Sequence, residues 1–362
     1  MSRLKVNAAV IGKEARDAFL RKAGAGCGTA GHAAAGPVFL GNIHSCFERA
    51  FNIVVPEGSV DSADLLIGLC RPGVPLSPLH LSIAWQSAIF DLPIREGEPI
   101  LATRRELVFP SLVVAWGEAE EYATFFQRQE RASPEACPVP EPTAPAIRAL
   151  CARVVAQGLT AGPLVQEGLL PLSERFNVDA EKRNSPAARP QSECGLADKN
   201  RVSDAAGALS RTAARAFPVL CRLSAAMRGR RQDRVFSAAR DMLGLGPGLT
   251  PSGDDFLTGL MVTDFAWRRR FPSKPALGEQ EMWRRLAEEA AGLTGTISRQ
   301  QLRLAAGGAS NEVFERVCWR LSRADERVLS DIPTLARFGA TSGLDYLAGV
   351  VFALRHLLIA SG

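Results

Sequence analysis

The chain has 362 residues and a formal net charge of +5, with 46% hydrophobic and 22% charged residues. This length allows two domains with separate cores, and the composition excludes a disordered or fibrous protein. The sequence shows no run of about 18 consecutive apolar residues and no apolar stretch near its start that would mark a secretory signal. We therefore expect a cytoplasmic protein with no membrane partner.

The short N-terminal apolar runs predict strands, because they are rich in β-branched residues and are separated by glycine and proline turns. These runs cover residues 37–40, 51–55, 65–70, 79–84 and 111–116. No long helical pattern separates most of them, which favours a mostly antiparallel sheet or small barrel over a parallel sheet. We expect a β-rich domain over residues 1–133.

Residues 134–200 are expected to connect two domains. Prolines recur at the start of this connection, and a short helix is predicted over 146–157. The stretch 171–201 is polar and interrupted by prolines, so it has too little apolar surface to offset the entropy of ordering. We expect an exposed, flexible loop there, with early tryptic cleavage near Lys182, Arg183 or Arg189.

Residues 201–362 carry apolar stripes at helical spacing. Four such stripes begin at Phe256, Met282, Val313 and Leu344. Helices that are densely apolar on one face pack against each other as a bundle. We therefore expect an all-helical C-terminal domain after the β domain, and an α+β fold for the whole chain.

Arginine dominates the start of the helical region. The arginines concerned are Arg201, Arg211, Arg215, Arg222, Arg228, Arg230, Arg231, Arg234 and Arg240. A basic helical surface can bind nucleic acid, but no recognised nucleic-acid motif accompanies this one and aromatic residues are sparse. We expect either a solvated face or a docking surface for an acidic partner subunit, and no nucleic-acid partner.

Cysteines and histidines do not suggest a metal centre. No two of the eight cysteines form a CxxC pair, and none of the four histidines is spaced with another histidine, cysteine or aspartate as zinc ligands would be. A Ser-His-Asp triad is not indicated either. We expect reduced, mostly buried thiols and no dedicated metal site.

Residues 244–259, with the sequence GLGPGLTPSGDDFLTG, form the most distinctive segment of the chain. Gly244 suits the left-handed position after a helix, and Ser252 suits the N-cap of the next one. Asp254 and Asp255 would then lie in the first turn, where the helix dipole favours negative charge. The segment lacks the lysine of a phosphate-binding P-loop and does not match the dinucleotide-binding fingerprint.

Helix capping does not explain why one connection holds so many glycines and hydroxyls. Glycines let a ligand approach the backbone, amides at a helix start bind anions, and hydroxyls add donors. The predicted substrate-binding residues here are Gly246, Gly248, Thr250, Ser252 and Gly253. For Asp254 and Asp255, the candidate catalytic residues, three roles are open: binding a Mg²⁺ that bridges to phosphate, accepting hydrogen bonds from an amide or carbamoyl NH₂, or acting as general base. The alternative is a helix capped by a carboxylate pair.

Two later segments also open helices with hydroxyls beside a glycine. The further predicted binding residues are Thr296, Ser298 and Arg299 in the first, and Thr341, Ser342 and Asp345 in the second. If the three helix starts converge at one end of the bundle, their amides, hydroxyls and carboxylates would line a common pocket. Ordinary N-capping is the alternative for both segments.

The 244–259 segment closely resembles the signature of the AllH-like proteins. The sequence TSGLDYLAG at 341–349 resembles that family's closing motif, and Thr296-Ile297-Ser298 lies between the two as it does in the family. The clear resemblance covers the C-terminal third of the chain. One difference is Ala340, which stands where the family's closing motif usually has a histidine.

The resemblance implies a subunit of oxamate carbamoyltransferase, which acts with other subunits in allantoin degradation. That enzyme converts N-carbamoyl-oxamate and phosphate into oxamate and carbamoyl phosphate. We therefore expect a subunit that binds carbamoyl phosphate or phosphate and a small carboxylate or amide such as oxamate. The alternative is a non-catalytic, anion-binding or regulatory subunit. The three segments offer no histidine, cysteine or lysine, so catalysis is expected to need a partner chain.

Overall fold

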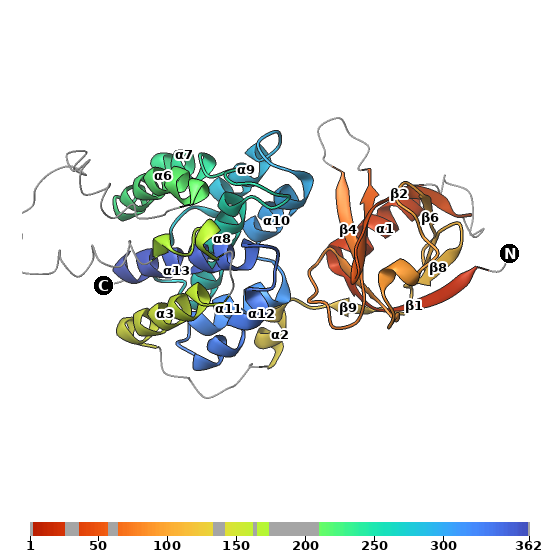
Figure 1. Cartoon of the computed structure of the whole chain (residues 1–362), viewed down its shortest axis with the longest axis horizontal. Helices are drawn as coiled ribbons and strands as arrows, with labels where there is room; N and C mark the ends of the chain where they lie inside the picture. The colour runs from red at the N-terminus through yellow and green to blue at the C-terminus, as the bar shows by residue number, and fades with distance from the viewer. Residues whose placement is uncertain are drawn as a thin grey trace, which may run out of the picture. The chain divides into compact units, whose positions relative to one another are not determined.

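The computed structural model describes residues 3–25, 36–56, 64–132, 142–161, 165–173 and 210–360 (Figure 1). The chain divides into two compact units. The first contains Met1–Glu135 and Ala309–Glu315, and the second contains Ala136–Gly308 and Arg316–Gly362. Almost all of the predicted loop 171–201, including Lys182 and Arg183, lies outside the described residues, so its flexibility and cleavage stay predictions.

The first unit is built mainly from strands. They are β1 (Leu4–Gly12), β2 (Val38–Cys46), β3 (Ala50–Val55), β4 (Leu65–Cys70), β5 (His80–Ile83), β6 (Pro99–Ala102), β7 (Glu106–Val108), β8 (Leu112–Ala115) and β9 (Glu120–Tyr122). Helix α1 (Lys13–Ala25), the 3₁₀ turn η1 (Ile89–Asp91) and helix α2 (Phe125–Ala132) complete the N-terminal part of this unit.

The strands form a barrel in the order β5-β4-β3-β2-β6-β7-β8-β1, closed by the pairing of β1 with β5. Strand β9 extends the sheet beside the end of β1. Three pairings are parallel (β4 with β5, and β1 with β8 and β9), and the other pairings are antiparallel. The expected α+β fold with a mostly antiparallel N-terminal barrel is confirmed.

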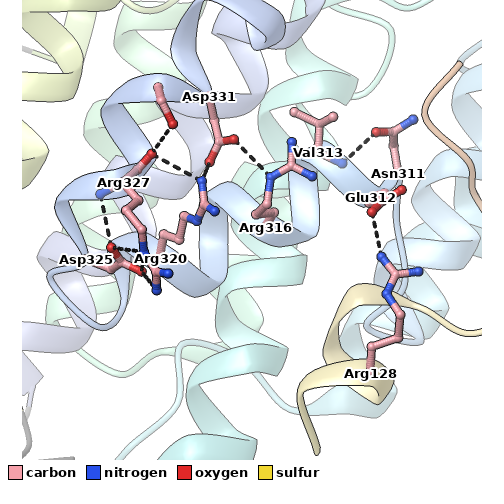
Figure 2. A network of polar contacts seen from close by, with 10 residues as sticks. Arg128, Asn311, Glu312, Val313, Arg316, Arg320, Asp325, Arg327 and Asp331 are labelled. Atoms are coloured by element: carbon pink, nitrogen blue, oxygen red, sulfur yellow. Dashed lines mark hydrogen bonds and ion pairs between the residues drawn. The ribbon is translucent and has the colours of Figure 1, made fainter. Parts of the chain in front are cut away.

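Segment 309–315 belongs to the first unit although it lies near the end of the chain. Its Glu312 amide donates to the Leu76 carbonyl (2.9 Å), and Arg128 of α2 forms an ion pair with the Glu312 carboxylate (2.6 Å; Figure 2). The buried Glu315 carboxylate accepts from the amides of Ser310 (2.8 Å) and Phe126 (3.3 Å). Burial raises the pKa of Glu315 to about 7.

The second unit is helical, as expected. Its elements are α3 (Ala144–Leu159), η2 (Val165–Glu167), α6 (Arg211–Arg228), α7 (Gln232–Arg240), α8 (Ser252–Arg270), α9 (Gln280–Glu289), α10 (Thr296–Ala306), the greater part of α11 (Glu312–Leu321), η3 (Glu326–Ser330), α12 (Ile332–Leu335) and α13 (Ser342–Ala360). Figure 1 shows α13 in the middle of this unit, between α6 and α3.

Helices α8 and α13 form the centre of the bundle and are buried along most of their length. A helix that is buried on all sides can be apolar on all sides. By length and composition α13 could cross a bilayer, but 83% of its most apolar window is buried inside the protein.

Two buried carboxylates of the bundle, Asp331 and Asp264, are compensated by nearby donors. The buried Asp331 carboxylate at the start of α12 accepts from Arg316 (2.9 Å) and Arg320 (2.6 Å) of α11, which point toward it in Figure 2. The fully buried Asp264 of α8 is compensated by more donors still. It accepts from the Leu277 amide (2.7 Å), the indole of Trp283 (2.8 Å) and the guanidinium of Arg268 (2.9 Å).

Candidate functional site

The glycine-rich turn joins α7 to α8. Helix α7 ends at Arg240, four residues before the predicted end, because 241–244 form turns instead of continuing the helix. Gly244 adopts the predicted left-handed conformation (φ +68°), and Gly246 and Gly248 also have positive φ (+119° and +100°). The predicted N-cap role of Ser252 is wrong: Pro251 is the N-cap, and Ser252 is the first helical residue.

The glycines of this turn serve two different purposes. A Cβ atom on Gly244 would collide with the carbonyl oxygen of Leu293, and one on Gly253 would collide with that of Met242. These two glycines therefore allow close backbone packing. A Cβ on Gly248 would meet nothing within 4 Å, so Gly248 lies at the open tip of the turn.

The backbone amides of the turn are only partly used by the protein. The sequence predicted that the Gly253 amide would bind an anion. In the structure this amide donates to the Leu245 carbonyl (2.8 Å) and is therefore not available. Among the described residues, no acceptor is found for the amides of Gly246, Gly248, Leu249 or Thr250. The amides open to an anion therefore belong to residues 246–250, ahead of the helix itself.

Asp254 ties the turn to the start of α10. It lies in the first turn of α8, as predicted, and is 1% exposed. Its Oδ1 accepts from the Gly244 amide (2.9 Å), and its Oδ2 accepts from the Thr294 hydroxyl. Burial raises the pKa of Asp254, while hydrogen bonds from Thr294, Gly244 and Ser298 lower it. Because both oxygens already have donors, the main role of Asp254 is to hold the turn and the start of α10 together.

Asp255, one residue further on, is in a different position. It is 2% exposed, and its Oδ2 has no hydrogen-bond partner. Burial and the nearby charge of Asp345 raise its pKa well above the ordinary value, while hydrogen bonds from Ser342 and Thr250 act in the opposite direction. The hydroxyls of Thr250 and Ser342 lie 2.8 Å apart, which joins the turn to the start of α13.

Asp345 comes from the first turn of α13 and is fully buried. Its Oδ1 accepts from the Leu169 amide (2.5 Å), and its Oδ2 has no partner. Burial raises its pKa to about 6, although hydrogen bonds from Leu169, Ser252 and Thr341 oppose the rise. No ion pair to Asp254, Asp255 or Asp345 is found in the part of the chain that the structure describes.

The three predicted helix starts meet at one place, as the convergence hypothesis required. Besides the contacts above, the Ser298 hydroxyl of α10 approaches the Leu249 carbonyl (3.5 Å). The predicted residues brought together are Thr250, Ser252, Ser298, Thr341, Ser342, Asp254, Asp255 and Asp345.

Two predicted residues do not join this cluster. Thr296 is exposed, and Arg299 forms no ion pair with the three carboxylates. The cluster also contains two residues that the sequence did not single out. Thr294 lies two residues before the predicted Thr296, and Leu169 follows η2, in a region that carries no recognisable motif.

A metal ion finds no dedicated ligand set here. In the described part of the chain, no group of three or more histidine, cysteine, aspartate or glutamate side chains could hold one. Asp254 already uses both oxygens, which leaves only the two carboxylates of Asp255 and Asp345. The free oxygens of Asp255 and Asp345 are the ones that a Mg²⁺ bridging to phosphate could use, because such an ion usually takes only one or two carboxylates together with water and the phosphate.

Two family models match the chain. Residues 242–354 match the model described as oxamate carbamoyltransferase subunit AllH, and this range contains all three helix starts. Residues 25–121 match the AllH family N-terminal domain, which covers most of the barrel. No curated protein and no solved structure gives a significant match.

Proposed function

The chain belongs to the AllH family, and from this premise we propose that it is a subunit of a carbamoyltransferase that acts on oxamate. In the forward reaction the bond between the carbamoyl carbon and the oxamate nitrogen breaks, and a bond from that carbon to a phosphate oxygen forms. The oxamate nitrogen gains a proton. The subunit would bind phosphate or carbamoyl phosphate together with the oxamate part.

The convergence of three helix starts beside amides that lack acceptors is the observation that supports this proposal best. The positive ends of the α8, α10 and α13 dipoles point to one region, where they favour a bound anion. The turn amides of Gly248, Leu249 and Thr250 would donate to phosphate or carboxylate oxygens. The hydroxyls of Thr250 and Ser342 would add two donors beside them.

A partner chain is part of the proposal. The three helix starts contain no histidine, lysine or cysteine to move protons or attack the carbamoyl carbon. The position of the family's histidine is occupied by Ala340, which is exposed. The same observations favour the second candidate function, a non-catalytic subunit that only binds the anion.

The arginine-rich surface is the candidate docking face for such a partner. Arg201 lies outside the described residues, and the eight others of the predicted set, on α6, α7 and the turn between them, are exposed. Helix α6 contains four arginines and no acidic residue. Within the described residues Arg211, Arg215, Arg228 and Arg234 form no ion pair. An acidic protein surface would compensate these charges.

The function is tested by assaying phosphate-dependent breakdown of N-carbamoyl-oxamate by the chain alone and with the proteins that co-purify with it. We expect turnover only in the second case. Thr250→Val should abolish it, since it removes a donor beside the anion. The matched control is Thr258→Val, because the Thr258 hydroxyl donates only to the Asp254 backbone carbonyl (2.9 Å).

Robust turnover by the lone chain would contradict the partner requirement. Anion binding without turnover in either preparation would favour the binding subunit. Arg211→Glu combined with Arg215→Glu should weaken co-purification, whereas Arg284→Glu on α9 should not. Equal co-purification of both variants would show that the arginine-rich surface is not the docking face.

A further inference from the structure

The starts of α8 and α13 share a sequence pattern. Residues 252–259 read SGDDFLTG and residues 342–349 read SGLDYLAG. Both contain a serine and a glycine, an aspartate two residues later, then an aromatic residue, a leucine and a second glycine. The pattern places Asp255 and Asp345 at equivalent positions of the two central helices.

The contacts between the two helices are reciprocal. A Cβ on Gly259 of α8 would collide with the Tyr346 carbonyl of α13, and a Cβ on Gly349 of α13 would collide with the Phe256 carbonyl of α8. Each second glycine thus packs against the aromatic residue of the other pattern. Reciprocal contacts of this kind are typical of two elements related by a twofold axis.

The carboxylates follow the same reciprocity. The hydroxyl of Ser342 on α13 acts to lower the pKa of Asp255 on α8, and the hydroxyl of Ser252 on α8 acts to lower the pKa of Asp345 on α13. Each aspartate also keeps one oxygen, Oδ2, that is buried and has no partner. The two equivalent carboxyl groups therefore interact electrostatically and present free acceptor atoms.

The charges around the pair do not neutralise it. The charged neighbour on α8 is Asp254, which adds a further negative charge. On the other elements packed at the site, Glu167 of η2 and Arg299 of α10 form no ion pair with Asp255 or Asp345. Two buried carboxylates with no compensating cation cannot both ionise readily, so the pair holds one proton more strongly than an ordinary carboxyl group does.

We propose that Asp255 and Asp345 share one proton and together bind a planar amide or ureido group. The protonated carboxyl donates to the carbonyl oxygen of that group, and the ionised carboxylate accepts from its N–H. This inference rests on the proposed function and specifies it: the amide of oxamate, or the carbamoyl group, enters between the helices while the anionic part stays at the turn amides. Because both aspartates are buried, a local movement of the protein has to admit the ligand.

The test compares oxamate with pyruvate, which has the same carboxylate and carbonyl but a methyl group in place of NH₂. Isothermal titration of the full chain at neutral pH should show at least tenfold tighter binding of oxamate. The advantage should disappear at alkaline pH, where the pair loses its proton and with it the donor.

Asp345→Asn should keep the preference for oxamate and remove its alkaline loss, because the asparagine amide donates at every pH. Its Oδ1 can still accept from the Leu169 amide, so the variant is expected to fold. Asp255→Ala should reduce the preference to about onefold. Glu315→Gln, which alters a buried carboxyl in the first unit, should leave the whole pH profile unchanged.

The proton itself is measured without a ligand. At pH 7 the wild type should show an infrared carbonyl band of a protonated carboxyl that Asp255→Asn lacks. Absence of this band, or equal affinities for oxamate and pyruvate, would contradict the proposal that Asp255 and Asp345 share a proton. The proposed anion site at the turn would not be affected by either result. If the wild type shows the band but binds neither phosphate nor oxamate, the proposed function fails, and so does the amide-binding role of the pair.

Discussion

Asp264 and Asp345 are both fully buried in the central helices, yet their surroundings are opposite. Asp264 faces an arginine, an indole and backbone amides, and these donors hold the connection from α8 to α9. Asp345 faces another carboxyl group, hydroxyls and one backbone amide, and keeps an oxygen with no partner. A buried charge that is compensated serves the fold. One that is left uncompensated lowers stability, and is a reason to look for a ligand.

The largest effect is expected when the compensated carboxylate is removed. Asp264→Ala leaves the Trp283 indole, the Leu277 amide and the Arg268 guanidinium without their acceptor. We expect a loss of about 3–5 kcal/mol in the free energy of unfolding, measured by urea denaturation. A loss below about 1 kcal/mol would show that compensation does not distinguish the two sites.

Asp345→Asn should instead raise the free energy of unfolding. The pKa of Asp345 is raised from 3.8 to about 6 by burial, so the wild type loses stability as pH rises from the unfolded-state value through about 6. The variant avoids this loss and should gain up to about 3 kcal/mol at pH 8 and little at pH 4. A gain that is the same at both pH values, or a net loss at pH 8, would contradict the uncompensated state of this carboxyl.

Thr294→Val converts Asp254 from a compensated into a partly uncompensated carboxylate. Its Oδ2 loses the Thr294 hydroxyl, while its Oδ1 keeps the Gly244 amide. We expect a loss of about 1–2 kcal/mol at neutral pH and a further rise in the pKa of Asp254. Thr258→Val is the control, and urea denaturation of both variants should show the larger loss at Thr294.

Gly248→Val should have the smallest effect on stability. It should mainly weaken the binding of an anion at the turn. A side chain there enters open space but is strained by the positive φ of +100°, which costs on the order of 1 kcal/mol. The variant should stay folded and lose the rise in melting temperature that millimolar phosphate gives the wild type. An unchanged phosphate response would place the anion elsewhere.

Several elements could be predicted because their signals are local. The five apolar runs correspond to β2, β3, β4, β5 and β8, and the 146–157 helix lies within α3. Strand β1 was missed because its LKVNAAVIG sequence mixes polar residues and alanines with a few apolar ones, and β7 and β9 are only three residues long. Their pairing depends on neighbours that are distant in sequence, which a local pattern does not contain.

The candidate site shows the same limit. Glycines, hydroxyls and aspartates at helix starts are visible as motifs, and their convergence could be stated as a hypothesis. What the motifs could not reveal is which oxygens remain without a donor. Asp254 and Asp255 are adjacent in sequence, yet Thr294 and Gly244 compensate the first, whereas the second faces Asp345 from a helix 90 residues away. Only tertiary packing decides that difference.

The membership of segment 309–315 in the first unit has a consequence for synthesis on the ribosome. The barrel strands leave the exit tunnel early, but the carboxylate that accepts from Ser310 and Phe126 belongs to Glu315 and is translated far later. The first unit therefore cannot be completed until most of the helical unit has been translated. A nascent chain stalled after residue 135 would carry a first unit that still lacks its last segment.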